Sequence, residues 1–205
     1  MPVLVRFFAY LCLVTPLAAQ VAGQSWDDQI KQRLFLPLGM KSSVTSTNDL
    51  AGRNNVATPH AKIDDQVQAI PYRNIDNVAP AGSINSSVRE MAAWVTVQLQ
   101  SGRFGDKRLL QTTTANDLHR VRMPMGERPR RTSAIVDVGY ALGWMVDVYR
   151  GHRRVHHGGN IDGFSAMVTL LPDDGCGFVA LTNLDATPLG ELAVRNLCDR
   201  VLELE

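Results

Sequence analysis

Cysteine is scarce in this sequence, and the few cysteines follow no recognisable spacing. The 205 residues include three of them, Cys12, Cys176 and Cys198. None forms a C-x-x-C pair and their number is odd, so the sequence predicts neither a zinc ribbon nor a disulfide framework. The chain also has no fixed-period repeat and no low-complexity segment, which argues against a repeat architecture.

An excess of charge of either sign is lacking as well. The formal net charge is +1, with 45% hydrophobic and 20% charged residues, an ordinary composition for a globular protein with one sizeable core or two small ones. This balance gives no reason to expect nucleic acid or an acidic membrane as a partner. The one basic stretch, residues 120–131, has five arginines but no aromatic residue, and we interpret it as a solvated loop.

The first 23 residues admit two interpretations. Residues 7–19 are nearly all apolar, follow Arg6 and lead to small residues at 21–23. This pattern fits a signal peptide, which predicts export to the periplasm or the medium. It also fits a remnant helix of the folded domain, interrupted near Pro16, which predicts a cytoplasmic protein. The apolar run is too short to span a bilayer stably.

Residues 24–136 are predicted to form a region of helices and loops. The predicted helices lie within residues 25–40, 87–102 and 113–121. Ser25 is placed to cap the first helix, whereas Ser87 and Glu90 form a capping box in which each side chain satisfies the other's backbone N–H. Residues 41–79 are predicted to be irregular, and a run of this length is usually functional or packed around a site.

Residues 137–205 are predicted to form an antiparallel sheet closed by a C-terminal helix. The expected strands are residues 140–149, 153–157, 164–171 and 177–182. The helix at 188–204 is expected to cover the sheet with an apolar stripe made of Leu189, Leu192, Ala193, Leu197, Val201 and Leu204. The sequence therefore predicts an α+β fold, with an antiparallel sheet covered by helices.

The candidate site is the polar, glycine-dense stretch between two of these strands, residues 153–164. A loop of this composition is a poor way to build a core and a common way to build a site. Gly158, Gly159 and Gly163 permit a positive φ or close approach to a bound group. His157 is expected at the end of a short strand, pointing along the loop, and alternation makes His156 an outward or structural neighbour. The alternative is that His157 is a core or surface histidine.

Six stretches of the sequence resemble one family when they are taken in order. They are residues 23–26 (G-Q-S-W), 37–40 (P-L-G-M), 80–84 (P-A-G-S-I), 140–144 (Y-A-L-G-W), 157–159 (H-G-G) and 181–183 (L-T-N). Together they resemble the serine β-lactamase and penicillin-binding-protein family, in its class C, esterase-like branch. The resemblance runs from about Val21 to the C-terminus and implies a β-lactamase-like fold.

The resemblance implies acyl transfer through a serine nucleophile, on a β-lactam, ester or peptide-like substrate and without a cofactor. In the family, a lysine one helical turn after that serine and a tyrosine in a Y-x-N box manage its protons. A third box, K-T-G or H-x-G, lines the cleft, and His157-Gly158-Gly159 matches the H-x-G form. His157 is then the expected catalytic residue, offering a hydrogen bond or positive charge to a substrate carboxyl or to the tyrosine. Gly158 and Gly159 are the expected substrate-binding residues.

The sequence departs from the family at its N-terminal side. No S-x-x-K is present, and Tyr72-Arg73-Asn74 follows residues 37–40 although the family's tyrosine box precedes them, so we interpret the Y-x-N match as a coincidence. The chain therefore resembles the C-terminal half to two-thirds of a serine hydrolase, and we expect it to be inactive alone. We also expect self-association or a complementing N-terminal chain, because exposed sheet edges recruit other chains.

Two other functions remain open from the sequence. The first is a non-catalytic binding or regulatory module that keeps the cleft wall without the nucleophile. A metal enzyme using His152, His156 and His157 is disfavoured, because their spacing suits no single face of a strand and no cysteine or paired acid accompanies them. We therefore expect no metal.

Overall fold

The computed structural model describes residues 21–125 and 134–204. Residues 1–20 of the predicted signal-like or remnant helix lie outside the described residues. Residues 126–131 of the arginine-rich loop lie outside them as well. In the described ranges, no helix combines the length and the apolar character that crossing a bilayer requires.

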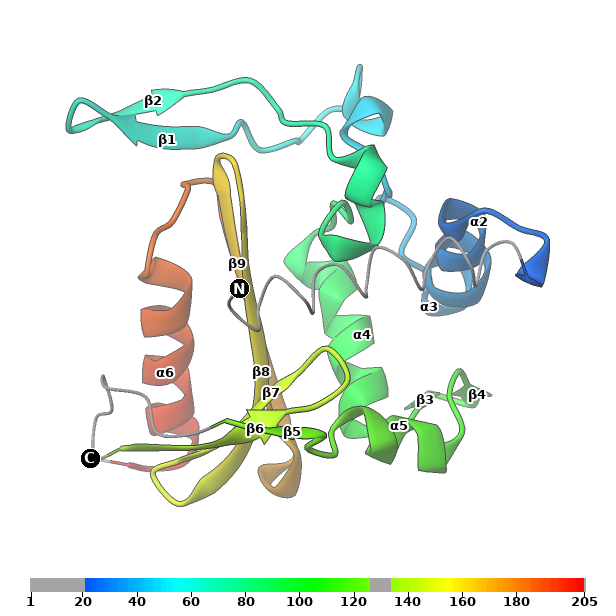
Figure 1. Cartoon of the computed structure of the whole chain (residues 1–205), viewed down its shortest axis with the longest axis vertical. Coiled ribbons are helices and arrows are strands. Elements are labelled where there is room, and N and C mark those ends of the chain that lie inside the picture. Colours follow the sequence, from blue (N-terminus) through cyan, green and yellow to red (C-terminus); the bar gives the residue numbers. More distant parts are fainter. Residues whose placement is uncertain (1–20, 126–133, 205) are drawn as a thin grey trace.

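The core element is one six-stranded antiparallel sheet, in the spatial order β10-β9-β8-β7-β6-β5 (Figure 1). Its strands are β5 (Met123–Pro124), β6 (Ile135–Tyr140), β7 (Met145–Tyr149), β8 (His152–Ile161), β9 (Phe164–Leu171) and β10 (Cys176–Thr182). Because each strand follows its neighbour in the sequence, the sheet is a simple meander. The predicted α+β architecture is confirmed, with two more strands than the sequence indicated.

Helices pack on both faces of this sheet, with α4 (Val88–Leu99) on one side and α6 (Leu189–Val201) on the other (Figure 1). Strand alternation sends Val155 toward α4, where it is buried with Val95 and Trp144. On the opposite face, Leu171 is buried against Val194 of α6. Full burial of such a side chain stabilises the fold by about 1.5–3 kcal/mol.

The remaining helices lie beside α4, away from α6 (Figure 1). They are α2 (Trp26–Ile30), a π-helical turn (Lys31–Phe35), α3 (Leu36–Leu38) and α5 (Thr112–Leu118), with 3-10 turns at Thr47–Leu50 and Asp76–Ala81. Ser25 caps α2 by accepting from the Asp28 N–H, and Gly39 ends α3 in the left-handed conformation. Both ends of the first helical segment are as the sequence predicts.

The capping box at α4 is only half formed. Ser87 Oγ accepts from the Glu90 N–H, as predicted. The Glu90 carboxylate instead accepts from the Ser42 N–H at 2.8 Å and from Ser43 Oγ at 2.6 Å. Glu90 thus ties α4 to the irregular segment after α3 through two charge-assisted hydrogen bonds.

Two local predictions are wrong because turns were not recognised. The strand expected at 140–149 is interrupted, because β6 ends at Tyr140 and β7 begins at Met145. The two strands are joined by a tight turn in which the Ala141 N–H donates to the Trp144 carbonyl and Gly143 has φ 82°. The segment 41–79 contains a hairpin, β1 (His60–Ile63) with β2 (Gln66–Ala69). Its turn is Asp64–Asp65, both at positive φ, a geometry that glycine or asparagine more often signals.

The apolar stripe predicted for α6 does not cover the sheet. Leu189 and Leu192 are 60% and 57% exposed, and Leu197 and Val201 are exposed as well. The covering face is made by Gly190, Val194 and Cys198. At Gly190 the helix lies close to β10, because a Cβ there would be in ordinary packing contact with the Ala180 methyl, at 3.5 Å. The stripe is therefore an exposed apolar surface of the described chain.

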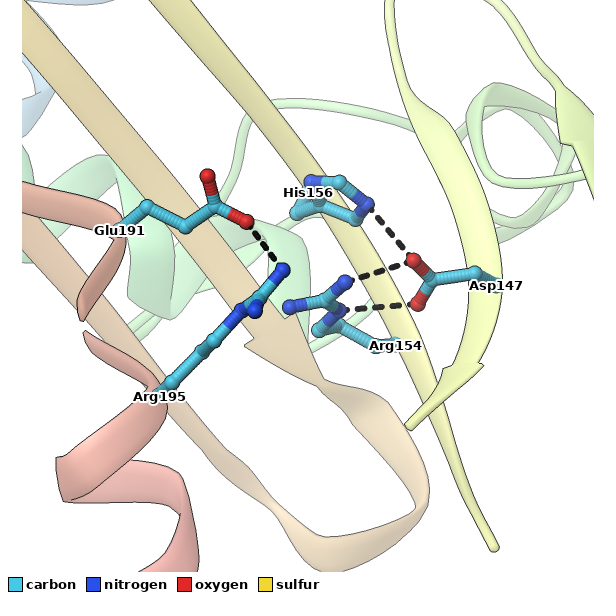
Figure 2. A network of polar contacts seen from close by, with 5 residues as sticks. All are labelled: Asp147, Arg154, His156, Glu191 and Arg195. Atoms are coloured by element: carbon cyan, nitrogen blue, oxygen red, sulfur yellow. Dashed lines mark hydrogen bonds and ion pairs between the residues drawn. The ribbon is translucent and has the colours of Figure 1, made fainter. Parts of the chain in front are cut away.

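A buried ion pair lies between the sheet and α6. Arg154 of β8 donates from Nε and Nη2 to the Asp147 carboxylate of β7, at 2.8 and 2.6 Å, and both residues are almost fully buried (Figure 2). His156 Nε2 lies 3.1 Å from the same carboxylate. Burial alone would raise the pKa of Asp147, but hydrogen bonds from Arg154 and His156 outweigh burial and lower it to about 2.

Removing one partner of this pair should be costly. Asp147→Ala leaves the Arg154 guanidinium buried and unpaired, and we expect a loss of about 3–5 kcal/mol in the free energy of unfolding, measured by urea denaturation. A matched control is Asp173→Ala, since Asp173 pairs with Arg153 of the same strand at 3.7 Å on the exposed surface. That loss should stay below about 1 kcal/mol. Equal losses in the two variants would contradict this account of the pair.

Candidate active site

The candidate site is built on β8, where one strand edge is open. β7 begins at Met145, which pairs with His156, so the β7–β8 ladder ends there. From His157 to Ile161, β8 pairs with β9 alone among the described strands. The predicted loop at 158–161 is therefore strand, and only Asp162 and Gly163 form the turn. Backbone N–H and C=O groups along such an edge are available to an extended ligand.

His157 lies at the start of this open edge, on the same face of the sheet as Val155 and α4. Its Nε2 lies 3.0 Å from the Tyr140 hydroxyl, and its Nδ1 lies 2.7 Å from the Gly158 carbonyl oxygen. Burial lowers the pKa of His157, although the Gly158 hydrogen bond opposes this. His157 is thus held within the strand and does not point along a loop. Tyr140 was not singled out by the sequence, although it opens the Y-A-L-G-W stretch.

The other two histidines of this region point elsewhere. His156 alternates to the α6 face, where it meets Asp147, and His152 Nδ1 lies 2.9 Å from Asp174 Oδ1 near the opposite end of β8. The expectation that His156 is a structural neighbour agrees with this placement. In the part of the chain that the structure describes, no group of three or more His, Cys, Asp or Glu side chains is arranged to hold a metal.

The two glycines after His157 have different surroundings. A Cβ on Gly158 would lie 3.2 Å from the Met167 Cε on the α6 face, whereas a Cβ on Gly159 would meet nothing within 4 Å. Neither glycine has positive φ, and of the predicted set only Gly163 does, with φ 87°. Gly159 therefore keeps space open on the face to which His157 belongs.

The far end of β8 is enclosed by segments from earlier in the chain. Gly82 packs on Ile161, at 3.4 Å from its virtual Cβ to the isoleucine methyl, so the P-A-G-S-I stretch bounds the open edge. Arg73 pairs with Asp162 at 2.9 Å, and the Tyr72 ring stacks on Phe164. The long segment at 41–79, which the sequence predicts to be functional or packed around a site, thus contacts the turn at the end of β8. Tyr72 donates its hydroxyl to the Ala57 carbonyl and serves this packing.

A second feature lies on the same face, between α4 and β10. An open hollow of about 400 Å³ is lined by apolar side chains from both elements. Its apolar lining is Val88, Ala92, Val95, Leu99, Cys176 and Val179. It adjoins the edge of β10, which pairs only with β9 within the described residues. Among the described strands of this face, β10 and the second half of β8 thus each have an edge without a strand partner.

Comparisons with known proteins agree on one family. A family model described as Beta-lactamase matches residues 7–197. The unguisins hydrolase ungD' of Aspergillus campestris is 25% identical over 193 residues, which are 92% of this chain and 35% of that protein. The chain thus spans about a third of the length of this relative. Penicillin-binding protein 4 from Amycolatopsis lactamdurans is 24% identical over 166 residues, which are 80% of this chain and 42% of that protein.

Solved structures show the same fold. The octameric penicillin-binding protein homologue from Pyrococcus abyssi superposes with a TM-score of 0.73 at 18% identity, over 91% of this chain and 40% of that one. At these identities the likeness concerns the fold alone, and it too covers less than half of the larger protein.

The difference between the two glycines can be tested by one substitution. Gly159→Ala should leave the free energy of unfolding unchanged or raise it by up to about 1 kcal/mol, because the methyl meets open space and glycine is costly in a strand. Gly139→Ala, in the same sheet, is the matched control. Its methyl would lie 2.4 Å from Val121 Cγ1 and 2.6 Å from the Met123 carbonyl oxygen, and overpacking should cost about 1–3 kcal/mol in urea denaturation. A comparable loss at Gly159 would show that its face is not open.

Proposed function

The chain belongs to the beta-lactamase family of serine hydrolases, and on that premise we propose that it forms the substrate-binding wall of an acyl-transfer site whose nucleophile lies outside this sequence. One observation carries this proposal. The open edge of β8 begins at His157-Gly158-Gly159, while no S-x-x-K occurs in the 205 residues.

The wall would bind an extended acyl or peptide-like group by adding it alongside β8. The unpaired backbone groups of this edge supply hydrogen bonds, and Gly159 leaves room above them. A nucleophile brought to this face would meet a substrate already oriented, which is how positioning lowers a reaction barrier. An amide-like substrate is supported by the name of one structural relative, a D-amino acid amidase from Ochrobactrum anthropi.

Activity should depend on what is added to this chain. Alone, it should not hydrolyse β-lactams or esters and should not be labelled by a β-lactam or a fluorophosphonate, because no serine here has a lysine one helical turn away. Labelling is read by intact-mass spectrometry, with a complete family enzyme as the positive control. Stoichiometric labelling at any serine of this chain would contradict the proposal.

A non-catalytic binding module is the second candidate, and the same missing S-x-x-K favours it. The two functions separate when the chain is compared with a version extended upstream in its gene. Hydrolysis by the extended form supports the acyl-transfer site, whereas binding of a slow substrate analogue without turnover in both forms supports the module.

The β10 edge and its surroundings suit a completing chain. Within residues 21–125 and 134–204, one edge of β10 has no strand partner. The apolar hollow lies beside that edge, and the exposed leucines of α6 lie on the other face of the sheet. An N-terminal segment of the same fold would pair with this edge and cover these apolar surfaces. Without it, unpaired backbone groups and apolar patches recruit other copies.

Self-association of the isolated chain is therefore expected, measured by sedimentation velocity or light scattering. Leu181→Lys, on β10 and 40% exposed in the unmodified chain, should reduce it because an edge lysine opposes strand pairing. Val136→Lys is the matched control, since Val136 is a 53% exposed strand residue on β6, remote from that edge. A stable monomer before any substitution would show that the β10 edge needs no partner.

A further inference from the structure

Both ring nitrogens of His157 are engaged by the chain itself. Nδ1 lies 2.7 Å from the Gly158 carbonyl oxygen. A carbonyl oxygen only accepts hydrogen bonds, so Nδ1 must carry a proton. In a neutral imidazole the other nitrogen is then a bare acceptor. The hydrogen bond at Nδ1 thus makes Nε2 a hydrogen-bond acceptor.

Tyr140 supplies the donor for that second nitrogen. Its hydroxyl lies 3.0 Å from His157 Nε2, and the two rings meet edge to face, with centroids 5.9 Å apart and planes at 73°. With Nε2 bare, the tyrosine O–H donates. Burial raises the pKa of Tyr140 and lowers that of His157, so both shifts favour a protonated phenol beside an uncharged imidazole.

The turn after β6 explains why a residue two strands away reaches His157. Tyr140 is the last residue of β6 and pairs with Met145, the first of β7. Met145 in turn pairs with His156. His157 therefore lies one residue beyond the end of β7, and the Tyr140 side chain reaches it around that end.

From this geometry we infer that Tyr140 is a positioning residue, which orients the His157 ring and holds it as the Nδ1–H tautomer. This tautomer changes the hydrogen bonding that His157 offers a ligand. The family resemblance implies a donor or a positive charge at His157. In this arrangement the Nε2 atom of His157 offers neither, because it accepts the hydrogen bond from the Tyr140 hydroxyl.

The tautomer can be measured directly on the isolated chain. Long-range proton–nitrogen correlation spectra of the uniformly ¹⁵N-labelled protein at pH 7.5 should show His157 as a single Nδ1–H tautomer, with a side-chain proton protected from exchange with water. His157→Gln assigns the signal. Tyr140→Phe keeps the ring contact but removes the donor. In this variant we expect the His157 side-chain proton to exchange with water at least several-fold faster. We also expect the ring to be a mixture of the two tautomers.

Two controls keep this result specific. Tyr72→Phe removes a hydroxyl that bonds to Ala57 and should leave the His157 signals unchanged. The buried ring of His119, whose Nε2 lies 2.9 Å from Gln98 Oε1, should be unchanged in every variant and reports that the fold is intact.

Either of two findings would overturn the inference. One is that His157 in the unsubstituted chain is an imidazolium or an Nε2–H tautomer at pH 7.5, and this decides the matter even if Tyr140→Phe fails to fold. The other is a folded Tyr140→Phe variant with His157 signals like those of the unsubstituted chain. Because these spectra need no nucleophile, their failure is distinct from failure of the labelling experiment.

Discussion

The buried ion pair between Asp147 and Arg154 fixes the arrangement on which the rest of the site depends. The two residues are direct cross-strand partners, and a one-residue slip of β7 along β8 would move one charge to the other face of the sheet and leave its buried partner unpaired. With this register, Met145 lies opposite His156 and β7 ends there. The open edge that begins at His157 is therefore a consequence of a pair that lies on the other side of the sheet.

Alternation along β8 divides two neighbouring histidines between two tasks. His156 faces α6 and supports Asp147, so it belongs to the buried polar layer (Figure 2). His157 faces α4 and meets Tyr140, so it belongs to the candidate site. A strand with period two can carry a structural network and a binding wall at once, because each face sees only every second residue.

The sequence predicted what local patterning encodes and missed what depends on turns and contact geometry. β9, β10, α4 and the H-G-G position could be predicted, because alternation, caps and glycine spacing are visible in the residues. The 141–144 turn was missed because Tyr140 to Tyr149 is almost continuously apolar or aromatic. The covering face of α6 was missed because hydropathy favours the larger leucines, which remain exposed, whereas the buried residues are Gly190, Val194 and Cys198. Tyr140 beside His157 could not be predicted, since the contact crosses a strand that has just ended.

The open edges of β8 and β10 have different consequences for assembly. The β8 edge is already shaped, because its histidine, its tyrosine and its glycines all come from this chain and hold one another in place. The β10 edge lies two strands away, with an apolar hollow beside it. A segment that completes the sheet at β10 would therefore leave the ladder between β7, β8 and β9 unchanged. In the assembly that we propose, a nucleophile supplied by the completing segment would meet a β8 edge that is already ordered when this chain folds, so no further ordering of that edge would oppose the reaction.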